Sequence, residues 1–348
     1  MYQRKKHEKV CSTDNTINEE NIQNLENRNS SKLFYIALLV RISSVFITRT
    51  FFVPDEYWQS SEVAHRKAFG YGYLTWEWKE QIRSYFYPFI FEIYFRLLRL
   101  LSLDTVLLVR YGPHVLQAIL TAVYDISVYR LTYKLTACRE TALIAFYLNI
   151  SSWFIFYTGS RTLSNVAEMC FSTIGLSYFP AVMNDDNKHG SFKELIMAFF
   201  FGGLACITRP TCFLIWIPLV LHAILWKTVD ILTLIKACLV AVPILLIFLF
   251  GIDFYFYGSF TVVHYNFLNF NIFQNIGEFY GAHAWHWYFL QGLPVVLNFH
   301  LVFVFLGASL KSSHLWISLF YIFIHRYVFA TSYFQIQDIL NDNLFKFL

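Results

Sequence analysis

Long apolar runs separated by polar segments occupy most of the chain. They lie at about 33–52, 86–103, 105–129, 141–159, 163–183, 194–208, 210–226, 229–252, 293–310 and 315–330. A straight helix needs roughly 20 residues to cross a hydrocarbon core. The pattern therefore predicts an all-α polytopic membrane protein with about eight to ten transmembrane or re-entrant helices. Only Arg209-Pro210 separates runs 194–208 and 210–226, so these are either two tight spans or one broken element.

Two segments interrupt this pattern without being short loops. They are 53–85 and 253–292, and both are rich in Trp, Tyr and His. Such side chains combine an apolar body with a polar tip, which suits the interface between membrane and water. We expect two structured loops that lie against the membrane.

The distribution of basic residues predicts the topology. The polar segment 1–32 begins with a basic cluster and lacks an apolar core, so it is expected to be a flexible cytosolic tail before a membrane domain at 33–348. Loop 53–85 follows one crossing later. No Lys or Arg lies between Lys236 and Lys311, so loop 253–292 is predicted on the same, non-cytosolic side. A shared side requires an even number of crossings, whereas the apolar runs between the loops are odd in number. One run must be re-entrant, or two must merge.

Composition narrows the function classes. Hydrophobic residues make up 57% of the 348 residues, aromatic residues 20% and charged residues 14%, whereas a soluble domain carries about 25% charged residues. This excludes a nucleic-acid binder, a secreted disulfide scaffold and a disordered chain. The six cysteines form no CxxC pair, so we expect neither a metal site nor a disulfide framework.

Asp55-Glu56 is the strongest local signal for chemistry. The two carboxylates follow Pro54 directly after the first apolar run. One interpretation is a general base with a partner that orients or tunes it. The other is the start of a helix, where Asp and Glu after Pro are favourable. Spacing alone slightly favours the helix start.

A polar stripe follows one face of the run 105–129. At about 100° per residue its members lie within about 80° of one another: Arg110, His114, Gln117, Thr121 and Asp125. Such a stripe faces the protein interior or an aqueous cavity. A network that joins neighbouring spans is at least as good an explanation as a substrate lining.

Two arginines lie beside apolar runs. Arg161 shares a helical face with Ser164 and Glu168, which favours either an intrahelical pair with Glu168 or a contact with a phosphate. Arg209 either extends to a head group or binds an anionic ligand.

The second loop contains Gly281-Ala282-His283-Ala284-Trp285-His286-Trp287-Tyr288. His-x-x-His offers too few ligands for zinc. Hydrogen bonds from His283 and His286 to a sugar or phosphate, with Trp285 stacked on a sugar face, fit better, and interfacial anchoring is the alternative. A transporter would carry its ionisable groups at mid-membrane in two related halves. Here they gather in two loops on one side without internal duplication, which favours a lipid-linked transferase.

Several strings resemble a known family. Thr50-Phe51-Phe52-Val53-Pro54-Asp55-Glu56-Tyr57-Trp58-Gln59, Tyr71-Gly72-Tyr73-Leu74-Thr75-Trp76-Glu77-Trp78 and Arg83-Ser84-Tyr85 resemble the first luminal loop of the glycosylphosphatidylinositol (GPI) mannosyltransferases of glycosyltransferase family 22. Ser160-Arg161-Thr162-Leu163-Ser164-Asn165, Thr208-Arg209-Pro210-Thr211 and the Trp285-His286-Trp287-Tyr288 stretch extend the match over about 33–310.

The resemblance implies a GT-C fold in the endoplasmic reticulum membrane with a luminal active site. It implies transfer of mannose from dolichyl phosphate mannose to the second mannose of the GPI precursor, through an inverted α-1,2 linkage, without a metal or other cofactor. By the same resemblance, Asp55 and Glu56 are the catalytic pair. The expected substrate contacts are Tyr57, Trp58, Gln59, Arg161, Arg209, His283, Trp285 and His286.

The C-terminal region departs from the family pattern. Family members continue with a His-Lys-Glu motif, whereas the nearest string here is Ile324-His325-Arg326, and the tail 331–348 is expected to be atypical or truncated. Transferases that elongate the dolichol-linked oligosaccharide share the Asp-Glu loop and are the sibling alternative. A transporter or a non-catalytic membrane subunit is the alternative from a different class.

Overall fold

The computed structural model describes residues 19–179, 192–274 and 285–303, and this part of the chain contains helices and turns but no strand. Three described helices are long and apolar enough to cross a membrane: Ser30–Ile47, Val106–Thr136 and Ile231–Tyr257. The expectation of an all-α membrane protein is confirmed. The C-terminal tail 331–348 and His325 lie outside the described residues.

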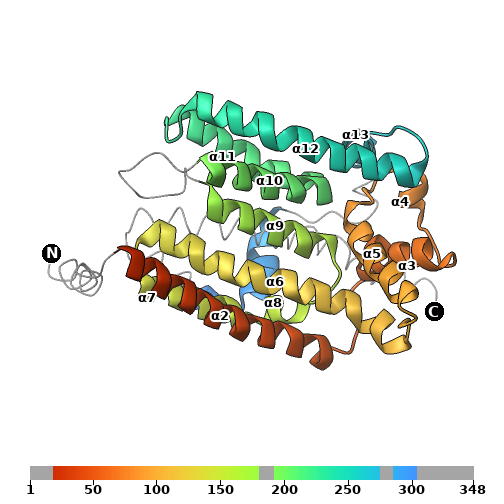
Figure 1. Ribbon diagram of the computed structural model, residues 1–348, viewed down its shortest axis with the longest axis horizontal. Coiled ribbons are helices and arrows are strands. Elements are labelled where there is room, and N and C mark those ends of the chain that lie inside the picture. The colour runs from red at the N-terminus through yellow and green to blue at the C-terminus, as the bar shows by residue number, and fades with distance from the viewer. Residues whose placement is uncertain (1–18, 180–191, 275–284, 304–348) are drawn as a thin grey trace.

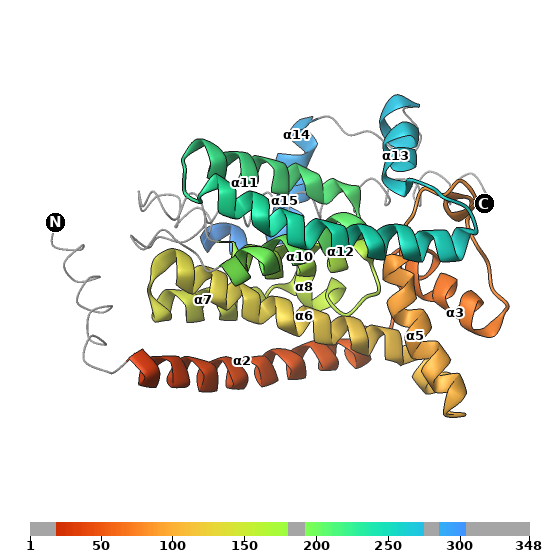
Figure 2. The same ribbon diagram turned by 45° about the horizontal axis from the view of Figure 1, so that its top comes forward.

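The helices of the bundle run along its long axis (Figures 1 and 2). Helix α2 (Glu19–Ile47) packs on α6 (Val106–Thr136), which also contacts α7 (Arg139–Ile150) and α9 (Ser164–Tyr178). Helix α10 (Phe192–Thr208) packs between α9 and α12 (Ile231–Tyr257). The remaining members are α8 (Trp153–Thr158) and α11 (Phe213–Leu225).

Helix α2 begins earlier than the apolar pattern predicts. It starts at Glu19, within the segment expected to be a flexible tail, and ends at Ile47.

Small residues allow the central helices to approach one another. A Cβ atom added to Gly202 of α10 would lie 2.6 Å from the ring of Trp216, and one added to Gly175 of α9 would lie 2.8 Å from it. Such close contacts between membrane helices depend on small residues. Helix α9 is consequently enclosed by its neighbours, and all of 164–177 is buried.

The Arg209-Pro210 boundary separates two helices. Helix α10 ends at Thr208, a short turn η3 covers Pro210–Cys212, and α11 begins at Phe213. Proline has no amide hydrogen and interrupts the helical ladder. The structure thus has two helices joined by a turn at this boundary, and that each of them crosses the membrane stays a prediction.

A cap of short elements closes one end of the bundle (Figure 2). From the first loop it contains η1 (Tyr57–Ser61), α3 (Glu62–Phe69) and α4 (Trp76–Lys79), and from the second α13 (Val263–Leu268) and η4 (Asn269–Phe273). The later elements α14 (Trp285–Trp287), η6 (Tyr288–Gly292) and α15 (Leu293–Leu297) lie beside the middle of the bundle instead (Figure 2). Helix α5 (Phe86–Leu100) stands beside α3 at this end rather than along the bundle (Figures 1 and 2). Leaving this run out of the count would make the number of apolar runs between the two loops even, and that each of the others crosses the membrane stays a prediction.

Direct contacts join the two loops. The Tyr257 hydroxyl donates to the Arg83 carbonyl (2.6 Å), and the Asn266 amide donates to the Gln81 carbonyl (3.1 Å). Asp253 at the end of α12 accepts hydrogen bonds from the Ser84 hydroxyl (3.0 Å) and the Tyr85 amide (2.8 Å). The two loops therefore lie together on one side of the bundle, as the charge pattern predicts.

Candidate active site

Asp55 and Glu56 stand at the start of a helical segment that continues through η1 and α3. The amides of Tyr57 and Trp58 donate to the Pro54 carbonyl at 3.1 and 3.0 Å. The helix-start interpretation therefore describes their position correctly. The next turn, η1, is a π-helical turn, and such turns occur often at functional sites.

Glu56 points into the protein. Its side chain is buried, with Oε2 2.7 Å from Nη1 of Arg161 and 3.1 Å from the amide of Phe52, which donates to it. The Thr162 hydroxyl donates to the Glu56 carbonyl (2.6 Å). A buried carboxylate needs a partner of opposite charge, so Glu56 fastens the start of the first loop to the segment before α9.

Arg161 is consequently not paired with Glu168. It precedes α9, which begins only at Ser164, so the two residues do not share one helix. The Arg161 guanidinium lies 4.3 Å from the centre of the Tyr157 ring. The interpretation of an intrahelical pair is wrong, because the chain turns between residues 159 and 163.

Asp55 lies in a different environment from its neighbour. It is half-buried, and its surroundings raise the pKa of its carboxyl from 3.8 to about 6. Burial contributes most to this rise and the negative charge of Glu77 adds to it, while Arg83, Arg209 and a hydrogen bond from Gln59 oppose it. A carboxylate with a pKa near the working pH is suited to accept a proton.

Gln59 connects the two sides of this environment. It is buried, its amide donates to Oε2 of Glu77 (3.3 Å), and its carbonyl oxygen accepts from the Ser164 hydroxyl (3.3 Å). Glu77 also holds Arg83, with a 2.8 Å ion pair between partly exposed side chains. Residues of η1, α4 and α9 thereby surround Asp55.

Arg209 enters the same environment from the α10–η3 junction. Its Nη1 donates to Oδ1 of Asn165 (2.7 Å) and to the Ser164 hydroxyl (3.2 Å), and its Nε lies 3.3 Å from Glu168. The Thr211 hydroxyl donates to Glu168 as well (2.7 Å). Arg209 is buried, so it does not extend to a head group, and its charge acts on Asp55.

The aromatic residues after Glu56 are exposed. Tyr57 and Trp58 show 41% and 45% of their surfaces, and the Trp58 carbonyl accepts a hydrogen bond from the indole of Trp78 (2.9 Å). Both are accessible to a substrate. Contact between these two side chains and a substrate stays a prediction.

The second loop is described only in part. His283 lies outside the described residues, and of Trp285 the structure describes only its place in α14. His286 has an exposed side chain in the same short helix. Within the described ranges no group of three or more His, Cys, Asp or Glu residues could hold a metal ion.

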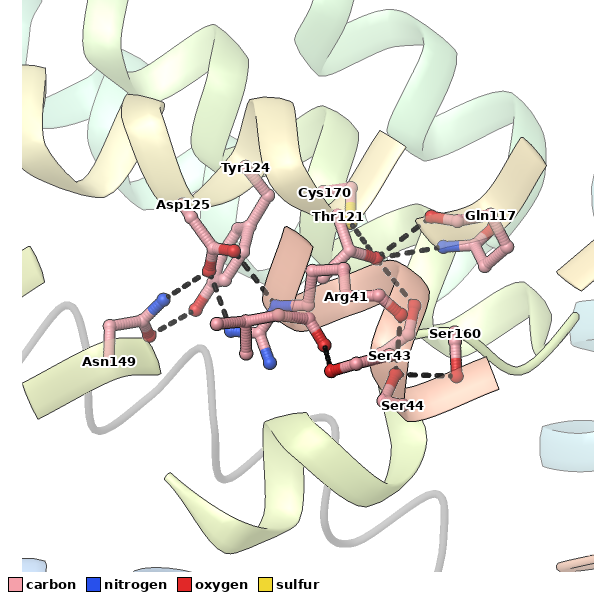
Figure 3. Close-up of polar contacts among 12 residues, drawn as sticks. Arg41, Ser43, Ser44, Gln117, Thr121, Tyr124, Asp125, Asn149, Ser160 and Cys170 are labelled. Atoms are coloured by element: carbon pink, nitrogen blue, oxygen red, sulfur yellow. Dashed lines mark hydrogen bonds and ion pairs between the residues drawn. The ribbon is translucent and has the colours of Figure 1, made fainter. Parts of the chain in front are cut away.

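The polar stripe of α6 divides into two parts. Asp125 and Arg41 of α2 are completely buried, and Nε and Nη2 of Arg41 each donate to one oxygen of Asp125 at 2.8 Å (Figure 3). The Asn149 amide donates to the same carboxylate (2.7 Å), and Thr121 donates to the Gly159 carbonyl. Here the network interpretation is confirmed, whereas Arg110 and His114 line a pocket.

Glu77 and Arg83 were not predicted as site residues. Both lie within the strings that carry the resemblance, which was the available signal. Their spacing from Asp55 does not indicate that α4 folds back toward η1. Only the packing of the cap brings the three charges together.

Fold and site together define a class of protein. It is an all-helical membrane protein with a carboxylate and two cations at one end of its bundle. Residues 32–335 match the model of the Alg9-like mannosyltransferase family, and the chain belongs to this family, a polytopic membrane family of GT-C type.

Similar curated proteins cover most of the chain. The chain is 44% identical over 279 residues to GPI mannosyltransferase 3 of Drosophila melanogaster, and this match covers 79% of the chain and 47% of the relative. The chain is 41% identical over 278 residues to GPI alpha-1,2-mannosyltransferase 3 of Homo sapiens, and this match covers 80% of the chain and 49% of the relative. GPI mannosyltransferase 3 of Candida albicans is 36% identical to the chain over 296 residues, and this match covers 84% of the chain and 58% of the relative.

The chain thus spans about half the length of the Drosophila melanogaster and Homo sapiens relatives. No solved structure matches the chain.

Proposed function

We propose that this chain is an inverting α-1,2-mannosyltransferase that moves mannose from dolichyl phosphate mannose to the second mannose of the GPI precursor. The observation that carries this proposal is Asp55, a half-buried carboxylate with a pKa of about 6 beside the cations Arg83 and Arg209. The names of the relatives support the linkage and the acceptor.

The proposed reaction is a single displacement. Asp55 accepts the proton of the acceptor hydroxyl, whose oxygen forms a bond to the anomeric carbon of mannose. The bond between that carbon and the phosphate oxygen breaks, and dolichyl phosphate leaves with the electron pair. Attack from the opposite side converts the β-linked donor into an α-linked product.

The leaving group needs only neutralisation of its charge, because a phosphate is already a good leaving group. Arg209 is the candidate for this role, since its charge acts on Asp55. Arg161 is a weaker candidate as a donor contact than the family pattern suggests, because it pairs with Glu56 and is not among the charges that act on Asp55. Glu56, buried in that pair, is proposed to position Asp55 rather than to touch the acceptor.

The proposed location follows from topology. The basic N-terminal cluster favours a cytosolic start, so the cap with Asp55 would face the lumen of the endoplasmic reticulum. A lipid-borne donor and a lipid-borne acceptor would then meet at the membrane surface of the cap.

The decisive experiment replaces Asp55 by Asn. Microsomes from cells that lack the third mannosyl transfer are loaded with the two-mannose GPI precursor, and mannose incorporation is measured. We expect the parent chain to transfer mannose and Asp55→Asn to lose roughly 10³-fold in rate, because a general base contributes about 10²–10⁴-fold. The matched control is Asp104→Asn, which removes an exposed carboxylate between α5 and α6.

The outcomes separate the alternatives. Transfer by Asp55→Asn at the parent rate would refute its role as the base. Extension of a dolichol-linked oligosaccharide in place of the GPI precursor would assign the chain to the sibling transferases. Absence of any transfer by a folded parent chain would favour a transporter or a non-catalytic subunit.

A further inference from the structure

A polar pocket lies on the Glu56 side of the first loop. It opens between the end of α2 and the beginning of α6, and its lining includes Thr48, Arg49, Tyr57, Arg110, His114 and Arg161. Asp55 is not among the lining residues. The pocket is therefore distinct from the environment of Asp55, although the two share a stretch of backbone.

The charge of the pocket favours an anion. Arg49, Arg110 and Arg161 line it together with a single carboxylate, that of Glu56. Glu56 occupies Nη1 of Arg161, which leaves the positive charges in excess. The two remaining arginines, Arg49 and Arg110, are exposed at the pocket and are therefore accessible to a ligand.

Arg161 supplies an independent observation. The residue is 3% exposed, and its Nη2 is buried without a hydrogen-bond partner among the residues that the structure describes. A buried donor without an acceptor is costly, and for a charged group the cost is greater. A phosphate oxygen in the pocket would supply the missing acceptor, and arginine pairs well with phosphate geometry.

The surroundings of the pocket indicate where the anion comes from. It lies at one end of two helices that are long and apolar enough to cross a membrane, Ser30–Ile47 and Val106–Thr136. Phe46, Ile47 and Phe51 beside it are 54%, 66% and 64% exposed. Exposed apolar side chains at the end of a span lie at the membrane surface, where phosphate groups are carried by lipids.

We propose that this pocket binds the phosphate group of an anionic membrane lipid, with Arg49 and Arg110 as direct contacts and Nη2 of Arg161 as the buried donor. The pocket shares Glu56, Tyr57 and Arg161 with the predicted site of transfer, but its two direct contacts, Arg49 and Arg110, belong to neither the environment of Asp55 nor the expected substrate contacts. Lipid bound here would clamp the end of α2 against the start of α6.

The test measures lipid retention by the purified full chain. The protein is exchanged from detergent into micelles that contain phosphatidylinositol or phosphatidylcholine, and bound lipid is counted by native mass spectrometry. We expect retention of phosphatidylinositol and a roughly ten-fold or greater loss in the double variant Arg49→Gln/Arg110→Gln, since two charge-assisted contacts disappear. Both side chains are exposed, so the variant should fold.

Two control variants separate this result from other effects. Arg130→Gln removes an exposed arginine near the other end of α6 and should retain the lipid. Asp55→Asn should retain it as well, so that failure of the transferase proposal leaves this test intact. Arg161 is left unchanged, because its loss would strand the buried charge of Glu56.

The competing source of phosphate has its own measurement. Inorganic phosphate is added at millimolar concentration to the complex with phosphatidylinositol. Displacement would assign the pocket to the phosphate group itself, and resistance would assign it to the lipid as a whole. Equal retention by the parent and the double variant, or equal retention of phosphatidylcholine, would overturn the proposal.

Discussion

Asp125 and Asp55 are both carboxylates in a protein with few charges, yet their surroundings differ in kind. Asp125 is completely buried in the bundle and accepts hydrogen bonds from Arg41 and Asn149 at 2.7–2.8 Å. Asp55 is half-buried at the end of the bundle, near one anion and two cations, with a raised pKa. A well-held carboxylate joins helices, whereas one in a mixed environment is available for chemistry.

The largest expected effect comes from breaking the interior pair. Asp125→Ala leaves Arg41 buried without its counter-charge, which costs about 3–5 kcal/mol in comparable buried pairs. We expect a large fall in the thermal unfolding temperature of the detergent-solubilised chain. The double variant Arg41→Met/Asp125→Leu should recover much of it, because it removes both charges. An unchanged unfolding temperature in Asp125→Ala would contradict the structural role.

A change at Arg209 is expected to lower activity rather than stability. Arg209→Lys should keep the fold, because it keeps a positive charge opposite Glu168. If Arg209 neutralises the leaving phosphate, the variant should lower kcat about 10²-fold, as loss of one transition-state donor does. The effect should appear in kcat more than in KM. A change confined to KM would assign Arg209 to ground-state binding alone.

The smallest effect concerns the pH dependence of transfer. Asp55 acts as a base only when deprotonated, so activity should fall as the pH decreases through about 6. Glu77 raises the pKa of Asp55, so Glu77→Gln should move this acidic limb to lower pH. In the same variant Arg83 loses its ion pair with Glu77, and its positive charge would also act to lower the pKa of Asp55.

The control for this shift is Glu80→Gln, which neutralises an exposed neighbour in the same segment. Its pH profile should match that of the parent chain. A limb that stays in place in Glu77→Gln, or moves to higher pH, would exclude Asp55 as the titrating base.

The amino-acid sequence predicted the class of protein well and the partners of individual charged side chains poorly. It predicted the membrane bundle, the shared side of the two loops and the position of Asp55-Glu56 at a helix start. For Arg161 it offered either a pair with Glu168 or a contact with a phosphate, and the pair was wrong because a helical wheel assumes one continuous helix. The structure pairs Arg161 with Glu56 instead, 105 residues away, and no local spacing encodes such a contact.

The amino-acid sequence by itself determined that this chain belongs in a membrane, since its apolar runs leave too little polar surface for water. It also determined where ionisable groups occur along those runs. Only the tertiary structure decided what each does. Adjacent residues on a helix point about 100° apart, so Asp55 and Glu56 face different neighbours. Packing of the cap against the bundle placed Arg161 beside Glu56, and Glu77, Arg83 and Arg209 around Asp55.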